Sequence, residues 1–440
     1  MFTLRANEAT RLIQHPREDD AERAGMNTAG TGTTGTGATS DLDVSSACIS
    51  RKSSSSSSTS KIFICSAIIL GVALLSAFTS KTTGTGMDSD ISSLAGFFHM
   101  HGGDTRTLKK KKKDDDDYDC KHDKSYSKTT LKLAYELPFV ALFQDTKHEK
   151  KFEASSIIIV NDTYYAICDN SWAISRFTSS LTPFSNDNIM IGDPNREEDE
   201  ESGYEVIFYN NSTFYVIRES VKHEGTDKDE AEYHAIVEEL VLNDAGDDYD
   251  IKDQCSCEFE FEGTSKGFEG GFGMEGTDGE FYIVGLCEGN HCSEKKKDDK
   301  GHGRMVLMKK KGCLWITVKQ INIPKTASFT DYSDMSIQEK NGKVVITSQE
   351  DSALWIGQMV GIVNGKLDPD LLGFDEDVYD VYHFPKSDTC KTKYCNIEGI
   401  AFINDDMIMA VSDKMKGKGK QSYRCLDKDQ SIHAFALPYV

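Results

Sequence analysis

Glu153–Asp169 reads EASSIIIVNDTYYAICD, and this pattern returns four more times toward the C-terminus. In each copy an acidic residue opens an apolar stretch, β-branched and aromatic residues follow, and a second acid closes the unit. The later copies open at intervals of 52 to 65 residues, at Glu205, Glu269, Asp334 and Glu398. A unit that repeats at such a period predicts a repeat architecture in which neighbouring units bury one another's faces.

A further stretch of strand-forming residues follows each copy. These stretches begin at Trp172, Glu232, Arg304, Ala353 and Ser431. Fourth strands are expected over 188–192, 257–263, 314–323 and 377–384, where apolar and β-branched residues recur. Blades of four strands around a channel are typical of a β-propeller. The sequence therefore predicts an all-β propeller of five blades, and a sixth, weakly marked blade stays open as an alternative.

The two ends of the repeat region predict how the ring closes. The last copy ends at Val440 with its third strand, and Leu131–Phe143 (LKLAYELPFVALF) reads as a strand that has no blade of its own. Pairing this segment into the last blade would cover an open strand edge, which folded proteins avoid exposing. We expect Leu131–Phe143 to supply that missing strand.

An uncharged stretch near the N-terminus predicts a membrane anchor. Ile62–Ser80 carries no charge and is long enough to cross a bilayer as a helix. Arg51, Lys52 and Lys61 precede it, which favours a cytoplasmic N-terminus and a type II single-pass topology. We therefore expect a disordered cytoplasmic tail over 1–60, a signal-anchor helix over 61–81, a disordered stalk over 82–119 and the propeller over 120–440.

Two features beyond the predicted anchor favour a luminal or extracellular propeller in the secretory pathway or at the cell surface. Glycosylation sequons begin at Asn161, Asn210 and Asn211. Ten of the twelve cysteines also lie beyond the span, which predicts disulfides. The spacings of Cys287 with Cys292 and of Cys390 with Cys395 suit small disulfide loops better than zinc knuckles.

The formal charge of −22 excludes one class of partner. Lys plus Arg and Asp plus Glu balance before residue 119, so the excess of acid belongs to the predicted propeller. Such a domain repels nucleic acid and attracts cations or basic partners. The membrane itself is the one partner that the predicted anchor implies.

The innermost strand of each blade lines a propeller's channel, so the opening acids are expected to converge there. Carboxylates held close together raise one another's pKa unless a cation joins them. Calcium suits such a set, because it accepts six to eight oxygen ligands in flexible geometry. The alternative is that these acids brace inner strands by accepting hydrogen bonds from backbone amides. The candidate ligands are Glu153, Glu205, Glu269, Asp334 and Glu398.

The repeat resembles that of the soluble calcium-activated nucleotidases, the apyrase family, and is similar to phytase-like propellers. The segment IEGIAFI (Ile397–Ile403) is similar to the family's terminal YEGIEF, which implies a calcium-binding role for Glu398. YEVIF around Glu205 and FEGG around Glu269 resemble blades whose acid faces the ion. Ser333 or Asp334 would face it from another blade. In the first blade a gapless alignment places Ser156 at the ligand position, with Glu153 three residues earlier.

Three functions follow from these residues. The first is a calcium-dependent hydrolase of phosphoanhydrides or phosphoesters, with Glu398 or Glu350 as base and Asp413 and Lys414 near the same channel mouth. The second is a binding module with structural calcium that presents loops such as 288–303 to a protein or glycan. The third, a serine esterase, ranks last because the chain has no G-x-S-x-G motif. Phosphate chemistry also needs basic residues, for which the candidates are Arg176, Arg218, Arg304, Lys266 and Lys414.

Overall fold

A computed structural model describes residues 128–438, with gaps at 198–199, 225–230, 265, 290–291, 293–300 and 416–427. All of these residues belong to one compact unit, Arg106–Val440. The predicted tail, anchor and stalk lie outside the described residues. Within the described part, no helix has both the length and the apolar character needed to cross a membrane.

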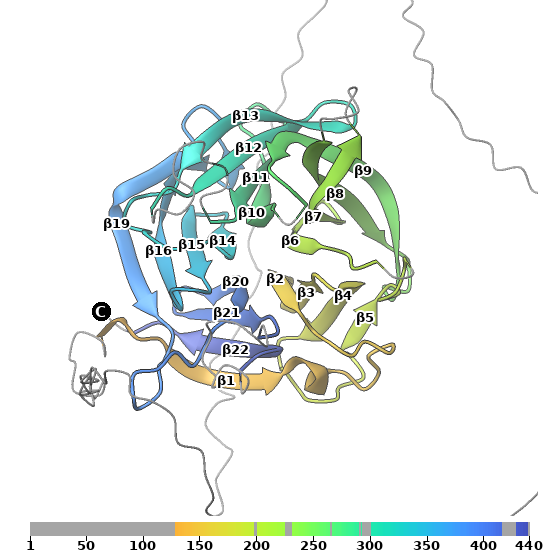
Figure 1. Ribbon diagram of the computed structural model, residues 1–440, viewed down its shortest axis with the longest axis vertical. Helices are drawn as coiled ribbons and strands as arrows, with labels where there is room; N and C mark the ends of the chain where they lie inside the picture. Colours follow the sequence, from red (N-terminus) through yellow and green to blue (C-terminus); the bar gives the residue numbers. More distant parts are fainter. Residues whose placement is uncertain are drawn as a thin grey trace, which may run out of the picture. The chain divides into compact units, whose positions relative to one another are not determined.

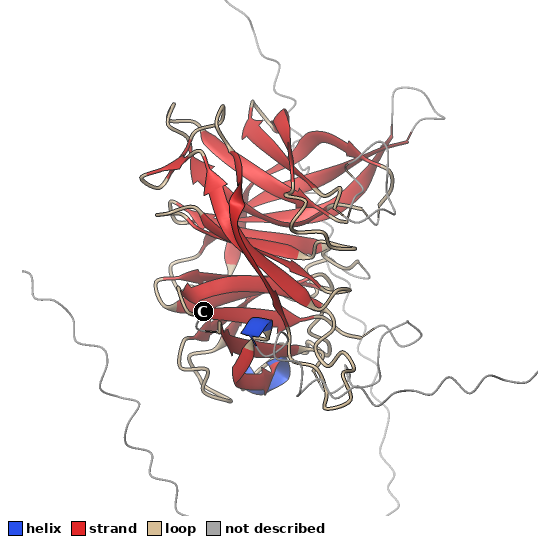
Figure 2. Ribbon diagram, turned by 90° about the vertical axis from the view of Figure 1, so that its left-hand side faces the viewer, coloured by secondary structure: helices blue, strands red, loops and turns tan. Residues whose placement is uncertain are grey.

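The described chain is built almost wholly of antiparallel strands (Figure 1, Figure 2). One four-stranded sheet holds β2 (Ala154–Val160), β3 (Thr163–Cys168), β4 (Ser171–Thr178) and β5 (Ile189–Ile191) in that order. A second holds β14 (Asp334–Gln338), β15 (Lys343–Ser348), β16 (Ala353–Val360) and β19 (Gly373–His383). A third has the order β20 (Ile397–Asn404), β21 (Met407–Ser412), β22 (Ser431–Ala436) and β1 (Lys132–Pro138).

The remaining long strands form one eight-stranded sheet. One half holds β6 (Tyr204–Asn210), β7 (Thr213–Glu224), β8 (Ala231–Leu242) and β9 (Tyr249–Phe261). The other holds β10 (Phe268–Glu275), β11 (Phe281–Cys287), β12 (Arg304–Lys310) and β13 (Leu314–Asn322). A small hairpin of β17 (Ile362–Val363) and β18 (Lys366–Leu367) lies apart from these sheets, and Phe139–Leu142 forms a 3₁₀ turn.

The sheets are arranged radially, with β2, β6, β10, β14 and β20 innermost (Figure 1). Each of these strands contacts the next one in the series, and β20 contacts β2, so the series closes on itself. A radial ring of antiparallel sheets is the architecture of a β-propeller, as the sequence predicts. The expected third strands and three of the expected fourth strands are present at the predicted places, whereas the fourth strand expected over 257–263 is the longer β9, which begins at Tyr249.

Strand β1 closes the ring as predicted. It pairs antiparallel with β22, and Glu136 lies opposite His433. Phe139, Leu142 and Phe143, which follow β1, are buried in a core cluster with residues of the first sheet. The closing segment therefore contributes both backbone pairing to the last sheet and apolar side chains to the layer between the last and the first sheets.

Two glycines let neighbouring inner strands approach one another closely. A Cβ atom at Gly270 would lie 2.5 Å from the backbone nitrogen of Met335, and one at Gly399 would lie 2.9 Å from the Cα atom of Ser156. No side chain tolerates such contacts without a backbone shift. The glycine that follows Glu269 and the one that follows Glu398 are therefore required by the packing of β10 on β14 and of β20 on β2.

The predicted glycosylation sequons fall in two equivalent hairpin turns. Asn161 and Asp162 connect β2 to β3 with φ of 48° and 61°, and Asn211 and Ser212 connect β6 to β7 with φ of 48° and 65°. Asparagine is favoured where the backbone is left-handed, as in two-residue hairpin turns. Turn chemistry alone therefore accounts for these asparagines, and glycosylation stays a prediction.

The halves of the eight-stranded sheet meet at their outer strands. Strands β9 and β13 run parallel and pair Ser256 with Leu314 and Cys257 with Trp315. A disulfide joins Cys255 to Cys313 at this junction. The predicted disulfide between Cys287 and Cys292 is confirmed, and Cys390 and Cys395 are also disulfide-bonded. Cys168 and Cys257 are buried free thiols.

Candidate cation site at one channel mouth

Three of the predicted acids stand at the same structural position in their sheets. The pairing of each inner strand with the next strand shifts register around Glu205, Glu269 and Glu398, which are the extra residues of β-bulges. Bulges of this kind redirect a side chain without ending the strand. The three carboxylates thus start β6, β10 and β20 at the same end of the channel.

Glu205 and Glu269 are carboxylates without a hydrogen-bonded or ion-paired partner in the described part of the chain. The structure gives neither side chain a hydrogen bond or an ion pair there, and Glu205 is only 7% exposed. Burial raises the pKa of Glu205 well above its usual value, and Glu269 raises it further, with Asp169, Glu219 and Glu398 adding to the effect. Burial and the charges of Glu288 and Glu219 raise the pKa of Glu269, and the charge of Lys266 lowers it. Buried, like-charged carboxylates of this kind are stable as anions only beside a cation.

The register corrects the sequence alignment in the first sheet. The shift between Ala154 and Ser156 places Ser155 at the bulge, so Ser155 corresponds to Glu205, and Glu153 lies two residues earlier. The Glu153 carboxylate lies 3.6 Å from Lys414 Nζ and 3.8 Å from Lys151 Nζ. One bulge residue changes which side chain faces the channel. The acids that recur in the sequence therefore do not all occupy equivalent positions in their sheets.

Asp334 is held differently from the three bulge acids. It is 1% exposed, and its carboxylate accepts hydrogen bonds from the backbone N–H groups of Met335 (2.8 Å) and Ile400 (2.7 Å). The Ser156 hydroxyl donates to it at 3.4 Å. Asp334 therefore braces β14 against β20 and β2, the alternative role considered for the acids, and Ser156 belongs to the same brace.

Asp331, which the repeat pattern in the sequence does not mark, also lies at this mouth. Its carboxylate accepts hydrogen bonds from the Ser348 hydroxyl and from the backbone N–H of Glu350. Burial raises the pKa of Asp331 to about 6. Burial also raises the pKa of Glu269, and the charges of Glu288, Glu219 and Asp331 add to that effect. Asp331 lies in the loop before β14, outside the repeating pattern, so strand periodicity carries no signal for it.

The closing acids of the repeat lie at the same mouth. Asp169, Glu288 and Asp413 directly follow β3, β11 and β21. Glu219 lies within β7, next to Arg218, the last residue of β7 that pairs with β6. Burial raises the pKa of Asp169 to about 8, and the charges of Asp413 and Glu153 contribute. Its Oδ1 atom is buried and accepts no hydrogen bond from the residues that the structure describes. Glu350, the candidate base of the fourth copy, is exposed.

Few basic side chains are available at this mouth. Lys266 pairs with Glu288 at 2.9 Å, and Lys414 pairs with Glu153. The Arg218 guanidinium donates to the Ser202 carbonyl and lies over the Trp172 ring at 4.5 Å. Arg176 and Arg304 donate to backbone carbonyls away from the acids, at Gly246 and at His302 and Gly303. A bound phosphate group would therefore depend mainly on a metal ion.

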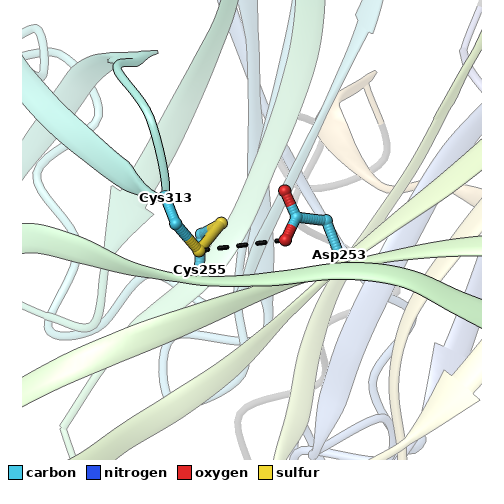
Figure 3. Close-up of side chains that lie close together, drawn as sticks. All are labelled: Asp253, Cys255 and Cys313. Carbon is cyan, nitrogen blue, oxygen red and sulfur yellow. Dashed lines mark hydrogen bonds between the residues drawn. A yellow bond between two sulfur atoms is a disulfide. The ribbon is translucent and has the colours of Figure 1, made fainter. Parts of the chain in front are cut away.

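The distances between the carboxylates bear on which cation they could coordinate. Among the residues that the structure describes, the only set of three ligand atoms lying within 4.8 Å of one another is Asp253, Cys255 and Cys313 (Figure 3). Its two sulfur atoms form a disulfide and Lys310 pairs with Asp253, so that set offers no thiolate. The channel carboxylates are more widely spaced than this. Calcium, which retains water ligands and tolerates long, irregular shells, fits them better than magnesium.

The opposite end of the channel is a cavity of about 560 Å³. The later residues of the inner strands line it, together with the hairpin turns at Asn161 and Asn211. Ile158, Phe208, Met335 and Phe402 are among its side chains. The channel is thus polarised, with carboxylates where the inner strands begin and a mixed apolar and backbone surface where they end.

A serine, a histidine and a glutamate meet beside β22. Ser412 Oγ lies 3.2 Å from His433 Nε2, and His433 Nδ1 lies 3.4 Å from a Glu136 carboxylate oxygen. The Ser412 hydroxyl, however, donates to the Lys428 carbonyl at 2.6 Å, and both Ser412 and His433 are fully buried. Burial lowers the pKa of His433 to about 3. This cluster joins β1 to β21 and β22, and it gives the esterase hypothesis no accessible nucleophile.

No family model matches the chain, and no curated protein matches its sequence. Solved structures similar to it include regucalcin from Agrobacterium tumefaciens, described as a calcium-binding protein, at 8% identity and a TM-score of 0.34, covering 71% of this chain and 97% of that one. The soluble aldose sugar dehydrogenase of Escherichia coli matches at 11% identity and a TM-score of 0.36, and the match covers 69% of this chain and 98% of that one. The Swd1 propeller domain of Myceliophthora thermophila matches at 7% identity and a TM-score of 0.32, and the match covers 70% of this chain and 99% of that one. Similarities at these scores carry no argument about function, and the nucleotidase resemblance stays a prediction.

Proposed function

We propose that this chain is a membrane-anchored, five-bladed propeller that binds calcium at the acidic mouth of its channel. The two halves of the eight-stranded sheet count as separate blades, because β9 and β13 share only two residue pairs. Each half also begins with an innermost strand, β6 or β10 (Figure 1). With the three four-stranded sheets this gives five blades.

The observation that carries the calcium proposal is the pair Glu205 and Glu269. Both lie on adjacent inner strands, are held at equivalent bulges and are given no hydrogen bond or ion pair among the described residues. Glu205 is buried and Glu269 is half-buried, and holding two such anions close together without a cation costs free energy that a cation would recover. Glu398 stands at a third equivalent bulge and couples to Glu205. These three are the calcium ligands that we propose from the original set.

We propose hydrolysis of a phosphoanhydride or phosphoester as the catalytic use of this ion, which would polarise a phosphoryl oxygen. Of the two bases expected from the sequence, Glu398 is now a proposed calcium ligand and Glu350 is exposed. We therefore propose Asp413 as the base, because it is 7% exposed and its charge acts on Asp169. The test is a comparison of nucleoside di- and triphosphates, pyrophosphate and phytate in calcium and in chelator. We expect calcium-dependent release of phosphate from at least one of them, and Asp413→Asn should slow it by about 100-fold or more.

The second candidate is a binding module in which calcium is structural. The pairing of Lys266 and Lys414 with glutamates favours it, because a phosphate substrate would find few free cations. Calcium-stabilised protein that leaves all four substrate classes intact would decide for this candidate. Most of loop 288–303, which the module would present to a partner, lies outside the described residues.

The luminal placement predicts glycans on the hairpin turns at Asn161 and at Asn210 or Asn211. Asn161 and Asn211 are exposed and lie at the channel end opposite the acids. Glycosidase treatment of the full chain from cells should increase its gel mobility. The variant carrying Thr163→Ala and Thr213→Ala together with Ser212→Ala removes all three sequons and should run at the treated position without treatment. An identical mobility of all samples would contradict the placement.

A further inference from the structure

The first sheet lacks a carboxylate at the position where Glu205, Glu269 and Glu398 stand in theirs. Ser155 occupies the bulge of β2, and its hydroxyl is directed to the Glu153 carbonyl at 3.5 Å. Glu153 itself lies between Lys151 and Lys414, which balance its charge. The residue that the sequence pattern offers is therefore neutralised by two lysines.

Asp169 is the other carboxylate that the first sheet brings to the mouth. It follows β3, the strand beside β2, and its backbone N–H donates to the Glu153 carbonyl at 2.9 Å. Its own carbonyl accepts from Gly203 N–H and from the Ser202 hydroxyl, which fixes the backbone between the first sheet and β6. The position of the Asp169 carboxylate is thus set by contacts on both sides.

The Asp169 side chain has a buried oxygen that no described residue donates to. Its Oδ1 atom is inaccessible and accepts no hydrogen bond within the described part of the chain. An orphaned buried carboxylate oxygen costs about 1–3 kcal/mol or more, so native structures retain one where a ligand completes it. Glu205, which is 7% exposed and has no partner among the described residues, is close enough to Asp169 for the Asp169 charge to raise its pKa, after burial and the charge of Glu269.

We infer that Asp169, and not Glu153, Ser155 or Ser156, is the residue through which the first sheet contacts the cation. This inference rests on the proposed calcium site and names a ligand for it. Asp169 then stands with Glu205 at the junction of the first sheet and β6. The first sheet would thus supply its calcium ligand from the end of its second strand, β3, and not from its innermost strand. Ser156 remains part of the Asp334 brace.

The test is the calcium dissociation constant of the full chain in detergent, measured by titration calorimetry for the parent and two matched variants. Asp169→Asn should weaken calcium binding by at least about tenfold, because calcium affinity follows the number of charged ligands. Glu153→Gln, its neighbour of the same charge, should leave the constant within about threefold of the parent. In chelator, Asp169→Asn should melt no lower than the parent, which shows that it folds.

Other results would overturn the inference in distinct ways. Loss of affinity in Glu153→Gln but not in Asp169→Asn would make Glu153 the ligand. Unchanged affinity in both would remove the first sheet from the site while the calcium proposal stands. No saturable binding by the parent would overturn both. If Asp169→Asn melts lower than the parent in chelator, Asp169→Ala is titrated in its place, and parental affinity in that variant overturns the inference.

Discussion

A chain that lacks residues 1–143 is expected to be insoluble, whereas a chain that lacks residues 1–118 is expected to fold. The longer deletion removes β1, which pairs with β22 from Lys132 to Pro138. It also removes Phe139, Leu142 and Phe143, each at most 2% exposed. Each of these side chains contributes about 1.5–3 kcal/mol by burial, and the exposed edge of β22 invites aggregation.

The measurement is the soluble fraction after expression, followed by the melting curve of whatever is soluble. The shorter deletion is the matched control, because it leaves every described residue in place. Equal solubility and equal melting temperatures for the two truncations would contradict closure by β1. A second variant, Pro138→Ala with Leu142→Ala, should destabilise the intact chain by about 2–5 kcal/mol, chiefly through the cavity left at Leu142.

Replacing both Glu205 and Glu269 by glutamine is expected to remove the response to calcium while stabilising the protein in chelator. Each glutamine is isosteric and neutral, so the buried repulsion between the two positions disappears. Calcium at a hundredfold excess over its Kd should stabilise the parent by roughly 2.7 kcal/mol and the double variant by much less. The melting temperature is followed with calcium, with magnesium and with chelator, and magnesium should stabilise the parent less than calcium does.

The exposed Glu376 on β19 supplies the control for charge alone. Glu376→Gln removes a negative charge far from the bulges and should keep the full calcium response. A double variant of Glu205 and Glu269 that melts lower than the parent in chelator would indicate that these glutamates are structural. A double variant that retains the parental response would place the calcium elsewhere.

Strand positions were predictable from the sequence because they depend on local patterns. The apolar runs around Ile157 and Val206, and the turn at Asn161–Asp162, mark hairpins within a few residues. Closure by Leu131–Phe143 could be predicted by counting strands. This segment belongs to no repeat, and the last blade has an open strand edge with which it can pair. Neither prediction required knowledge of contacts distant in the chain.

The candidate site was less predictable, because it depends on register. A single bulge residue decides that Ser155 corresponds to Glu205, and no periodicity shows where a bulge falls. Asp331 reaches the mouth from a loop, and the Asp334 carboxylate accepts a hydrogen bond from the backbone of Ile400 on the neighbouring inner strand β20. The pairing of β9 with β13 joins strands of two separate repeats, and the sequence pattern of neither repeat predicts it.

Direct titration of calcium into the chelator-treated full chain tests the central claim most directly. The account predicts saturable binding, together with a melting temperature that rises as calcium is added, because the ion binds the folded form alone. Absence of saturable heat, with a melting curve that calcium and chelator leave unmoved, would contradict it. The carboxylates at the channel mouth would then be structural acids, and the calcium site would have to be abandoned.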